Sequence, residues 1–508
     1  MDHEIGRRAF VGAMAVAAAS PLLRAAEREG DGSDRPASVD RIEFGGCPTV
    51  EKALRIAAVI YAKNRRKDAL SSFYTTGYRM TVSPEGFPVS VCISPDFTFG
   101  LLGARYHPDD VYLKTLLGML DLMPRNMRRN GRFFLNEDML IGGERVMNQV
   151  MYPIWIWELY LATGDIEVVR RHREPLSRCL AYIESRTDKD GVVNQVDHDD
   201  WQLSEGADWV DWSPERLEGS TCVYHAWYAR ALAHAACIFE AAGDAKAAEE
   251  ARSRHRRQRS VLDTRFWSGR QYYDNLNFAG RKVESFWCDS QLWPIAYGFA
   301  SKDQAAAVFS RIDAQPDFFE GVPTRWCAPL PDEVVRYLAR RYPDMPPEPH
   351  LRPFTWFGRL GAGDILARRM SGQDAHAFKL LQRYCDVVVR HGTCPECLDM
   401  DGNIREGTSG GRGYLEHAGG LLLAAGRGIW GIDDTADGSI IWKPFLPPEA
   451  KKVSLPFWHK GRRWTFGYED GGYWIDPDGS RGTVKVILDG KEERVDADGK
   501  RVLIRKEP

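Results

Sequence analysis

The chain has 508 residues, of which 44% are hydrophobic and 27% are charged, a globular composition that excludes a mainly disordered chain. Its formal net charge of -3 provides no general basic surface, so we expect neither nucleic acid nor an anionic membrane as a partner. The 16 Trp, 19 Tyr and 22 Phe residues suit sugar faces where they stand beside polar groups, although packing between helices explains most of them.

The N-terminus carries an arginine pair, Arg7 and Arg8, before an uncharged small-residue stretch at positions 12–19. This stretch is too short to span a membrane as a mature helix, and the arrangement resembles a twin-arginine export signal. We expect the signal to occupy residues 1–26 and a linker to occupy residues 27–49. The protein is then expected in the periplasm or outside the cell, and soluble once the signal is removed.

Apolar residues recur with a helical period from about residue 50 to 436. Three similar connectors, Ala162–Asp165, Ala241–Asp244 and Gly361–Asp364, place a Gly where one helix can end and an Asp where the next can begin. Their spacing is close to multiples of roughly 40 residues, which predicts about six helical hairpins.

Other connectors in this region are long and rich in Trp and acidic residues, at about 194–220, 317–349 and 393–413. Tight turns at one end and long loops at the other favour a closed ring over an open solenoid. We therefore predict a mainly α fold, an (α/α)6 barrel or six-hairpin toroid over residues 50–436. Strand-like runs and Asp-Gly turns then predict a small antiparallel β domain over residues 437–508.

Two of the long loops combine carboxylates with aromatic residues, around positions 197–216 and 395–417. Hydrolysis of a glycosidic bond by direct displacement needs one protonated carboxyl group for the leaving oxygen and one carboxylate for water. Loops that meet at a barrel mouth can hold such a pair, and Trp rings can raise the pKa of the acid by desolvation. Each carboxylate taken alone could equally be a turn residue or a helix cap.

The segment Asp208–Pro214, followed by Tyr224–Ala229, resembles the six-hairpin glycosidases, most closely the bacterial α-L-rhamnosidases. His391–Glu396 resembles the turn that delivers their general-base Glu, and Glu416–Gly420 resembles the helix start that follows it. The tail from Ile440 to Pro444 looks like their C-terminal β-sandwich. The resemblance implies an inverting glycoside hydrolase that acts on an oligosaccharide or polysaccharide and needs no cofactor or metal.

Under this resemblance Glu396 is the general base and Asp211 the general acid. Rhamnosidases carry their acid upstream in a D-E-R run, whereas the corresponding stretch here, residues 94–100, has no Glu and offers Asp96. The setting of Asp211 is closer to that of the acid in trehalases and processing glucosidases, and Asp208 and Asp96 remain its competitors. The expected substrate-binding residues are Asp208, Trp209, Trp212, Trp356, Arg412, His417 and Asp96.

Three other functions remain open. A sugar phosphorylase would need an anion site, for which Thr408–Arg412 is a weak candidate. A polysaccharide lyase or epimerase on the same barrel could use His198, His225 or His417 as its base. A non-catalytic carbohydrate-binding protein would use the Trp loops without the carboxylates.

The cysteines give no metal signature. Cys394 and Cys397 have C-x-x-C spacing, but no second Cys or His pair stands at a matching distance. A local disulfide and two free thiols both fit that pair. Cys179, Cys222 and Cys237 lie in apolar helical patterns and are expected to be buried as small hydrophobic residues.

Overall fold

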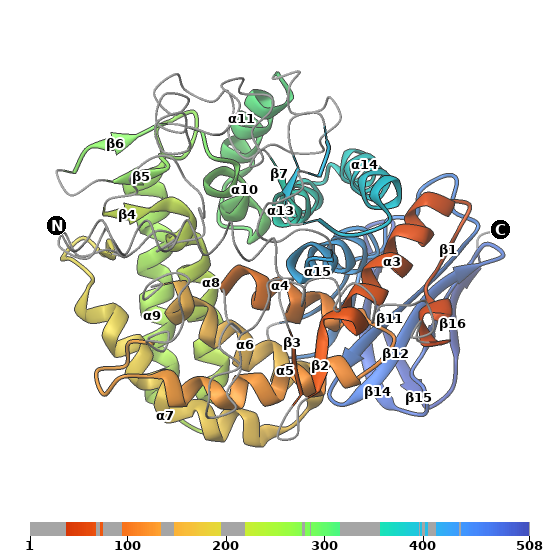
Figure 1. Cartoon of the computed structure of the whole chain (residues 1–508), viewed down its shortest axis with the longest axis horizontal. Helices are drawn as coiled ribbons and strands as arrows, with labels where there is room; N and C mark the ends of the chain where they lie inside the picture. The colour runs from red at the N-terminus through yellow and green to blue at the C-terminus, as the bar shows by residue number, and fades with distance from the viewer. Residues whose placement is uncertain are drawn as a thin grey trace, which may run out of the picture.

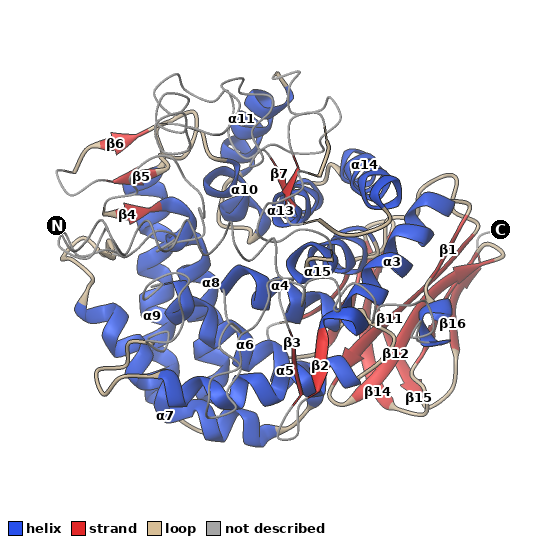
Figure 2. Cartoon of the chain, in the orientation of Figure 1, coloured by secondary structure: helices blue, strands red, loops and turns tan. Residues whose placement is uncertain are grey.

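The structure is a computed structural model of the whole chain. It describes residues 37–67, 72–74, 94–133, 147–194, 219–276, 280–284, 286–314, 356–395, 397–398, 402–404, 413–435 and 438–506. Within this part, helices form the body of the molecule and the longer strands gather at one side (Figure 2).

Twelve α-helices in the described part form two concentric rings (Figure 1). The inner helices are α4 (Ser94–Ala104), α6 (Met147–Thr163), α8 (Cys222–Ala241), α10 (Cys288–Ala296), α13 (Gly358–Met370) and α15 (Leu415–Leu423). The outer helices are α3 (Pro48–Asn64), α5 (Val111–Leu122), α7 (Ile166–Ser185), α9 (Ala245–Val261), α11 (Lys302–Asp313) and α14 (Asp374–His391). Each inner helix contacts the next, and α15 contacts α4. The ring is closed, which confirms the predicted (α/α)6 barrel.

Short helical turns extend or connect these helices. They are η1 (Ala37–Arg41), η2 (Met123–Asn126), η3 (Leu262–Phe266) and η6 (Ala424–Ile429), of which η3 and η6 are π-helical.

Helices of the outer and inner rings differ in how much of their surface is buried. The outer helix α14 buries one stripe that includes Ala377, Leu381, Tyr384 and Val388, and its charged residues occupy other faces. The inner helix α8 is buried over almost its whole surface because neighbours surround it. The outer helix α14 is therefore amphipathic, whereas the inner helix α8 is mostly apolar on all sides.

Two of the three predicted connectors are confirmed. Gly164 and Gly243 both take positive φ, and Asp165 and Asp244 then cap α7 and α9 by accepting hydrogen bonds from backbone N–H groups. Positive φ costs glycine little, so it ends a helix readily.

The third predicted connector, Gly361–Asp364, is wrong because these residues lie inside α13. A small residue is needed at position 363 because α13 packs closely against Trp293. An added Cβ on Gly363 would stand 3.2 Å from the Trp293 ring. Asp364 is buried and accepts a hydrogen bond from Arg368 one turn later at 3.1 Å. The turn between α13 and α14 instead uses Gly372, whose φ is positive.

The barrel has two unlike ends. Each connection from an inner helix to the outer helix that follows is short, from two residues between α6 and α7 to six between α4 and α5. Each connection from an outer helix to the next inner helix is long. The N-terminal ends of the inner helices therefore all lie at the long-connector end, where the sequence predicted the chemical loops.

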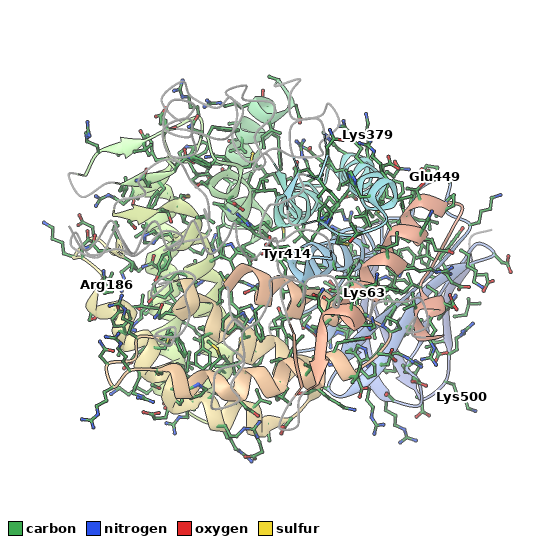
Figure 3. The ribbon with its side chains drawn as sticks, viewed as in Figure 1. Lys63, Arg186, Lys379, Tyr414, Glu449 and Lys500 are labelled. Carbon is green, nitrogen blue, oxygen red and sulfur yellow. The ribbon has the colours of Figure 1, made fainter. Side chains whose placement is uncertain are left out.

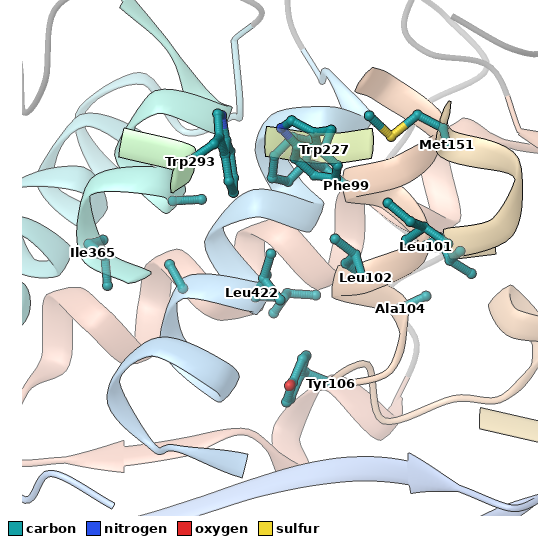
Figure 4. Packing of buried hydrophobic residues seen from close by; sticks show 14 of the residues in the cluster. Phe99, Leu101, Leu102, Ala104, Tyr106, Met151, Trp227, Trp293, Ile365 and Leu422 are labelled. Carbon is teal, nitrogen blue, oxygen red and sulfur yellow. The ribbon is translucent and has the colours of Figure 1, made fainter. Parts of the chain in front are cut away.

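Aromatic side chains fill the barrel core, and glycines allow two of its helices to approach closely. Trp227 and Trp293 pack with ring centroids 4.7 Å apart, and Phe99 lies 5.7 Å from Trp293 (Figure 4). Where α4 meets α15, an added Cβ on Gly103 would stand 2.4 Å from the Cα of Gly419, and one on Gly419 would stand 2.1 Å from the carbonyl oxygen of Phe99. The ring closes at this point because both helices lack side chains there.

The C-terminal domain contains two main sheets. Their strands are β1 (Glu43–Gly45), β9 (Ile432–Asp434), β10 (Ile440–Trp442), β11 (Lys452–His459), β12 (Arg462–Glu469), β13 (Gly472–Asp476), β14 (Arg481–Leu488), β15 (Lys491–Asp498) and β16 (Val502–Lys506). One sheet has the order β1-β11-β12-β13-β16 and the other β15-β14-β10-β9. Pairing is antiparallel except between β10 and β14. Trp442 of one sheet contacts Phe466 of the other, at 5.1 Å between ring centroids.

Two short strands near the expected domain borders pair with strands of the C-terminal sheets. Residues 43–45, placed in the expected linker, form β1 and pair with β11 of the C-terminal domain. Residues 432–434, placed in the barrel, form β9 and pair with β10. The three-residue lengths of these strands explain why no alternating pattern marked them in the sequence.

Among the described residues, three shorter sheets lie outside the C-terminal domain. They pair β2 (Arg65–Lys67) with β3 (Ser72–Tyr74), β4 (Ser220–Thr221) with β5 (Asn275–Leu276) and β6 (Lys282–Val283), and β7 (Trp356–Phe357) with β8 (Cys397–Leu398).

A buried ionic group joins the barrel to the β domain at the short-connector end. This seam cluster consists of Arg105, Glu158, Arg427, Asp433, Asp434 and His459. Arg105 donates to Glu158 at 2.9 Å and to Asp434, and also to the Trp458 carbonyl oxygen at 3.0 Å. The neighbouring Arg105 charge holds the pKa of Asp434 well below its usual range, although burial opposes this shift.

The expected export signal, residues 1–26 with Arg7 and Arg8, lies outside the described residues. In the described part, no helix combines the length and the hydropathy that crossing a membrane would need.

Candidate active site

Three charged side chains meet at the long-connector end of the barrel. Asp289, Arg359 and Glu416 are the second residues of α10, α13 and α15. The Arg359 guanidinium donates to Asp289 Oδ2 through Nε and to Glu416 Oε1 through an Nη, both at 3.4 Å. All three side chains are at most 3% exposed. We call these three residues the Arg359 cluster.

The cluster places two carboxylates around one guanidinium in a buried position. Burial raises the pKa of Asp289, even though Arg359 and the Trp293 indole N–H, at 3.0 Å from Oδ1, favour its charged form. Burial of a charge is costly unless it is paired, so the three helix ends depend on one another.

His417, the residue after Glu416, holds the segment that precedes Glu396. Its Nδ1 lies 2.6 Å from the carbonyl oxygen of Pro395. A carbonyl oxygen can only accept, so Nδ1 carries the proton. Burial lowers the pKa of His417 to about 3. The ring is therefore neutral at ordinary pH, with the lone pair on Nε2.

The starts of α13 and α15 touch each other beside this ring. An added Cβ on Gly358 would stand 2.7 Å from the Cα of His417. The Tyr384 hydroxyl of α14 lies 3.0 Å from the Gly358 carbonyl oxygen and 3.1 Å from that of His417. These contacts fix the two helix ends relative to each other.

Both described flanks of position 396 are fixed to these helix ends. The carbonyl oxygen of Cys394 accepts from the N–H groups of Gly413 at 3.0 Å and Tyr414 at 2.7 Å. Tyr414 lies near the middle of the view in Figure 3, among the inner helices. On the other flank, Cys397 and Leu398 form β8 and pair with β7, which leads directly into α13. Glu396 itself lies outside the described residues.

His225 secures the described ends of the loop that contains Asp208 and Asp211. Its Nδ1 donates to Gln258 Oε1 at 2.6 Å, and its Nε2 accepts from the Ser220 hydroxyl at 2.8 Å. Gln258 in turn donates to the Gly191 carbonyl oxygen at 2.8 Å. Burial lowers the pKa of His225 to about 4. With both ring nitrogens engaged in a fully buried site, His225 is a structural residue, which argues against its use as a lyase or epimerase base.

Most of the predicted site residues fall outside the described part of the chain, and their roles stay predictions. They are Asp208, Trp209, Asp211, Trp212, Glu396 and Arg412, together with His198. Trp356 lies in β7 and Asp96 in α4, but the structure describes only their backbones. The expected separation between the carboxyl groups of Asp211 and Glu396 likewise stays a prediction. Among the predicted catalytic and substrate-binding residues, the structure describes the side chain of His417 alone.

Sequence reasoning missed Asp289 and Arg359. Each is a charged residue in the first turn of a helix that neighbours enclose, and a charge in such a position has to be paired. The run from Trp287 to Trp293 contains Asp289 as its one charged residue. That isolated carboxylate was the available signal, but only the assembled ring identifies Arg359 as its partner.

The cysteines behave as small buried residues in the described part. Cys179 and Cys222 are buried as expected, and Cys237 is half-buried. The Cys394 thiol is buried and outside any disulfide, and burial raises its pKa. Among the described residues, no group of three or more His, Cys, Asp and Glu is placed to hold a metal ion.

A surface hollow of about 570 Å³ lies away from the Arg359 cluster. It is lined by Arg259, Asp263 and Trp267 on one side and by Phe299 and Gln304 on the other. These residues belong to α9, η3, α11 and the turn that precedes α11, on the outside of the barrel. The hollow therefore carries no part of the candidate site.

Comparison with known families supports the resemblance seen in the sequence. Residues 143–314 match the bacterial alpha-L-rhamnosidase 6 hairpin glycosidase domain. The chain thus resembles the six-hairpin glycosidases, and bacterial α-L-rhamnosidases in particular. The matched segment extends from the start of α6 to the end of α11. A comparison with curated proteins gave no match.

Several solved structures share the fold. The GH78 family rhamnosidase of Bacillus sp. GL1 is 14% identical with a TM-score of 0.58, over 83% of this chain and 39% of that one. A sialidase is 14% identical with a TM-score of 0.63, over 90% and 41%. The alpha-L-rhamnosidase from Dictyoglumus thermophilum is 12% identical with a TM-score of 0.52, over 80% and 45%. At these identities the likeness concerns the fold alone, and this chain spans less than half the length of each.

Proposed function

We propose that this protein is a rhamnosidase-like, inverting glycoside hydrolase of oligosaccharides or polysaccharides, with Glu396 as its general base. The observation that carries the proposal is the fixation of both described flanks of position 396 on the N-terminal ends of α13 and α15. The match to a rhamnosidase six-hairpin domain supports the same reaction class. The fold alone would not, because one fold hosts many reactions.

In the proposed reaction, Glu396 takes a proton from water as the water oxygen bonds to the anomeric carbon. The bond from that carbon to the leaving oxygen breaks, and the acid gives this oxygen its proton. Asp211 is the proposed acid, with Asp208 and Asp96 as competitors. Neutral His417 holds Pro395 and so helps to place the base. No cofactor or metal takes part in this scheme.

The test is a panel of aryl glycosides that begins with p-nitrophenyl α-L-rhamnoside, assayed with the wild type and with Glu396→Gln. We expect Glu396→Gln to lower kcat by several orders of magnitude while the protein stays folded. Proton NMR of the first sugar product should show the inverted anomer. A wild type inactive on the whole panel, or a fully active Glu396→Gln variant, would refute the proposal.

The acid is identified by comparing Asp211→Asn, Asp208→Asn and Asp96→Asn on substrates with good and poor leaving groups. The variant that lacks the acid should lose activity on poor leaving groups and keep much of it on activated aryl glycosides. This contrast in Asp96→Asn or Asp208→Asn, and not in Asp211→Asn, would move the acid role without removing the hydrolase function.

We also propose twin-arginine export to the periplasm or the medium. Replacement of Arg7 and Arg8 by Lys should leave an uncleaved precursor in the cytoplasm, as measured by cell fractionation. Normal export of that variant would disprove this route.

A further inference from the structure

The two described flanks of position 396 belong to different parts of the barrel. Pro395 is bound to His417 of α15. Cys397 pairs with Phe357 of β7, which continues into α13. The relative position of the starts of α13 and α15 therefore sets the distance between these two flanks.

The Arg359–Glu416 ion pair connects those same two helix starts. Arg359 comes two residues after Phe357, and Glu416 comes one residue before His417. Their contact of 3.4 Å is buried on both sides. The pair thus lies within two residues of each element that holds a flank of position 396.

We propose that Arg359 and Glu416 are positioning residues that hold the proposed general base, Glu396, in its working place through α13 and α15. This inference rests on the proposed function. Asp289 completes the arrangement, because it is the second carboxylate of Arg359 and comes from the next inner helix. The inner helices α10, α13 and α15 are thus coupled through one guanidinium.

Charge makes this role distinguishable from simple packing. In the part of the chain that the structure describes, the titratable groups around the pair come from α10, α14 and α15, and from the turn before α15. They are Asp289, Tyr384, His391, Cys394 and His417. Charges act over longer distances in a buried site than in water. Removal of the Arg359 charge should therefore raise the pKa of a nearby carboxylate base, and removal of the Glu416 charge should lower it.

The test compares Glu416→Gln with a matched control further along α13. Asp364 and Arg368 form a buried ion pair there at 3.1 Å, so Asp364→Asn also neutralises one buried carboxylate. The assay uses the aryl glycoside of the panel that the wild type cleaves fastest. It measures kcat, KM and the pH profile of kcat/KM, together with the urea midpoint of each variant.

We expect Glu416→Gln to lower kcat about tenfold or more with KM changed by less than about threefold, since orientation of the base acts on the chemical step. The acidic limb of its kcat/KM profile should move to lower pH. Asp364→Asn should change the urea midpoint and leave kcat and the acidic limb within about twofold and a few tenths of a pH unit of the wild type.

The variants Arg359→Lys and Arg359→Met test the other member of the ion pair. Lys keeps the charge and should retain more of kcat than Met, and the Met variant should move the acidic limb to higher pH. If Arg359→Met does not fold, Glu416→Gln and Arg359→Lys still decide the question.

The outcomes separate the two proposals. If Glu396→Gln abolishes turnover while Glu416→Gln behaves like Asp364→Asn, the positioning role is wrong and the hydrolase function stands. If Glu396→Gln keeps wild-type turnover, the proposed function fails and the positioning role fails with it.

Discussion

The seam cluster and the Arg359 cluster lie at opposite ends of the barrel, and their charges are paired differently. In the seam cluster, Arg105 and Arg427 each contact two carboxylates, and several of these contacts are 2.9 Å or shorter. In the Arg359 cluster one guanidinium serves two carboxylates, each at 3.4 Å. Short, multiply bonded charges fix one geometry. The seam cluster is therefore the expected source of stability, and the Arg359 cluster the expected source of function.

The largest effect on stability should come from Arg105→Met in the seam cluster. The variant leaves Glu158 and Asp434 buried without their main cation, which should cost about 3–5 kcal/mol in the free energy of unfolding. Urea unfolding followed by circular dichroism measures the loss. A change below about 1 kcal/mol would show that the seam contributes little and would remove the contrast between the two ends.

Acid should destabilise both ends. Burial lowers the pKa of His107, near the seam, to about 4, and that of His417, near the Arg359 cluster, to about 3. Below the ordinary pKa of 6.5, these histidines are protonated in the unfolded chain but stay neutral in the folded protein. The free energy of unfolding therefore decreases as the pH falls from 6.5 towards 4. Each such residue contributes about 1.4 kcal/mol per pH unit in that window.

Urea midpoints at pH 7, 6, 5 and 4.5 measure this slope. In the His107→Gln variant, the slope of the free energy of unfolding against pH should decrease by the contribution of about one bound proton. An unchanged slope would mean that His107 is not the neutral buried group described here. Asp434 acts in the same direction at lower pH, because its pKa is depressed and its contribution disappears as it is protonated.

Gly358→Ala should have a smaller effect on stability and a clear one on turnover. The added methyl group would meet His417 at 2.7–2.8 Å, and such crowding costs about 1–3 kcal/mol. The control is Gly118→Ala in α5, where an added Cβ meets nothing within 4 Å. That variant should be stabilised by up to about 1 kcal/mol with kcat unchanged. Equal kcat values for the two variants would contradict close packing at the start of α13.

The smallest effect should come from Arg481→Ala. Arg481 pairs with Asp498 at 2.7 Å, but the two side chains are 84% and 81% exposed. Exposed ion pairs contribute little, so the urea midpoint should correspond to a change within about 0.5 kcal/mol. A larger loss would show that contact length, and not burial, decides the strength of ion pairs in this protein.

The sequence predicted the parts of the fold that local signals specify. Gly164 with Asp165 and Gly243 with Asp244 mark helix ends because a left-handed glycine and a capping carboxylate act within a few residues. The same reasoning failed at Gly363 and Asp364, where small size serves packing against Trp293. A local pattern does not distinguish a turn glycine from a packing glycine when an Asp follows both.

The site was less predictable than the fold. His417 could be selected because a family-like segment surrounds it, and the structure gives its partner, Pro395. Arg359 could not be selected, because its partners Asp289 and Glu416 are distant in sequence and meet only when the ring closes. Charges that act through tertiary contacts leave no periodic signal.

The short strand β1 has a consequence for the order in which the molecule can be completed. Glu43 pairs with Ser454, so one of the earliest described segments waits for a partner made roughly 400 residues later, and pairing over such a distance is slow. During synthesis the barrel helices can form while the edge of β11 is still missing. This sheet can therefore be completed only after β11 has been synthesised, and it joins two described segments that lie far apart in the sequence.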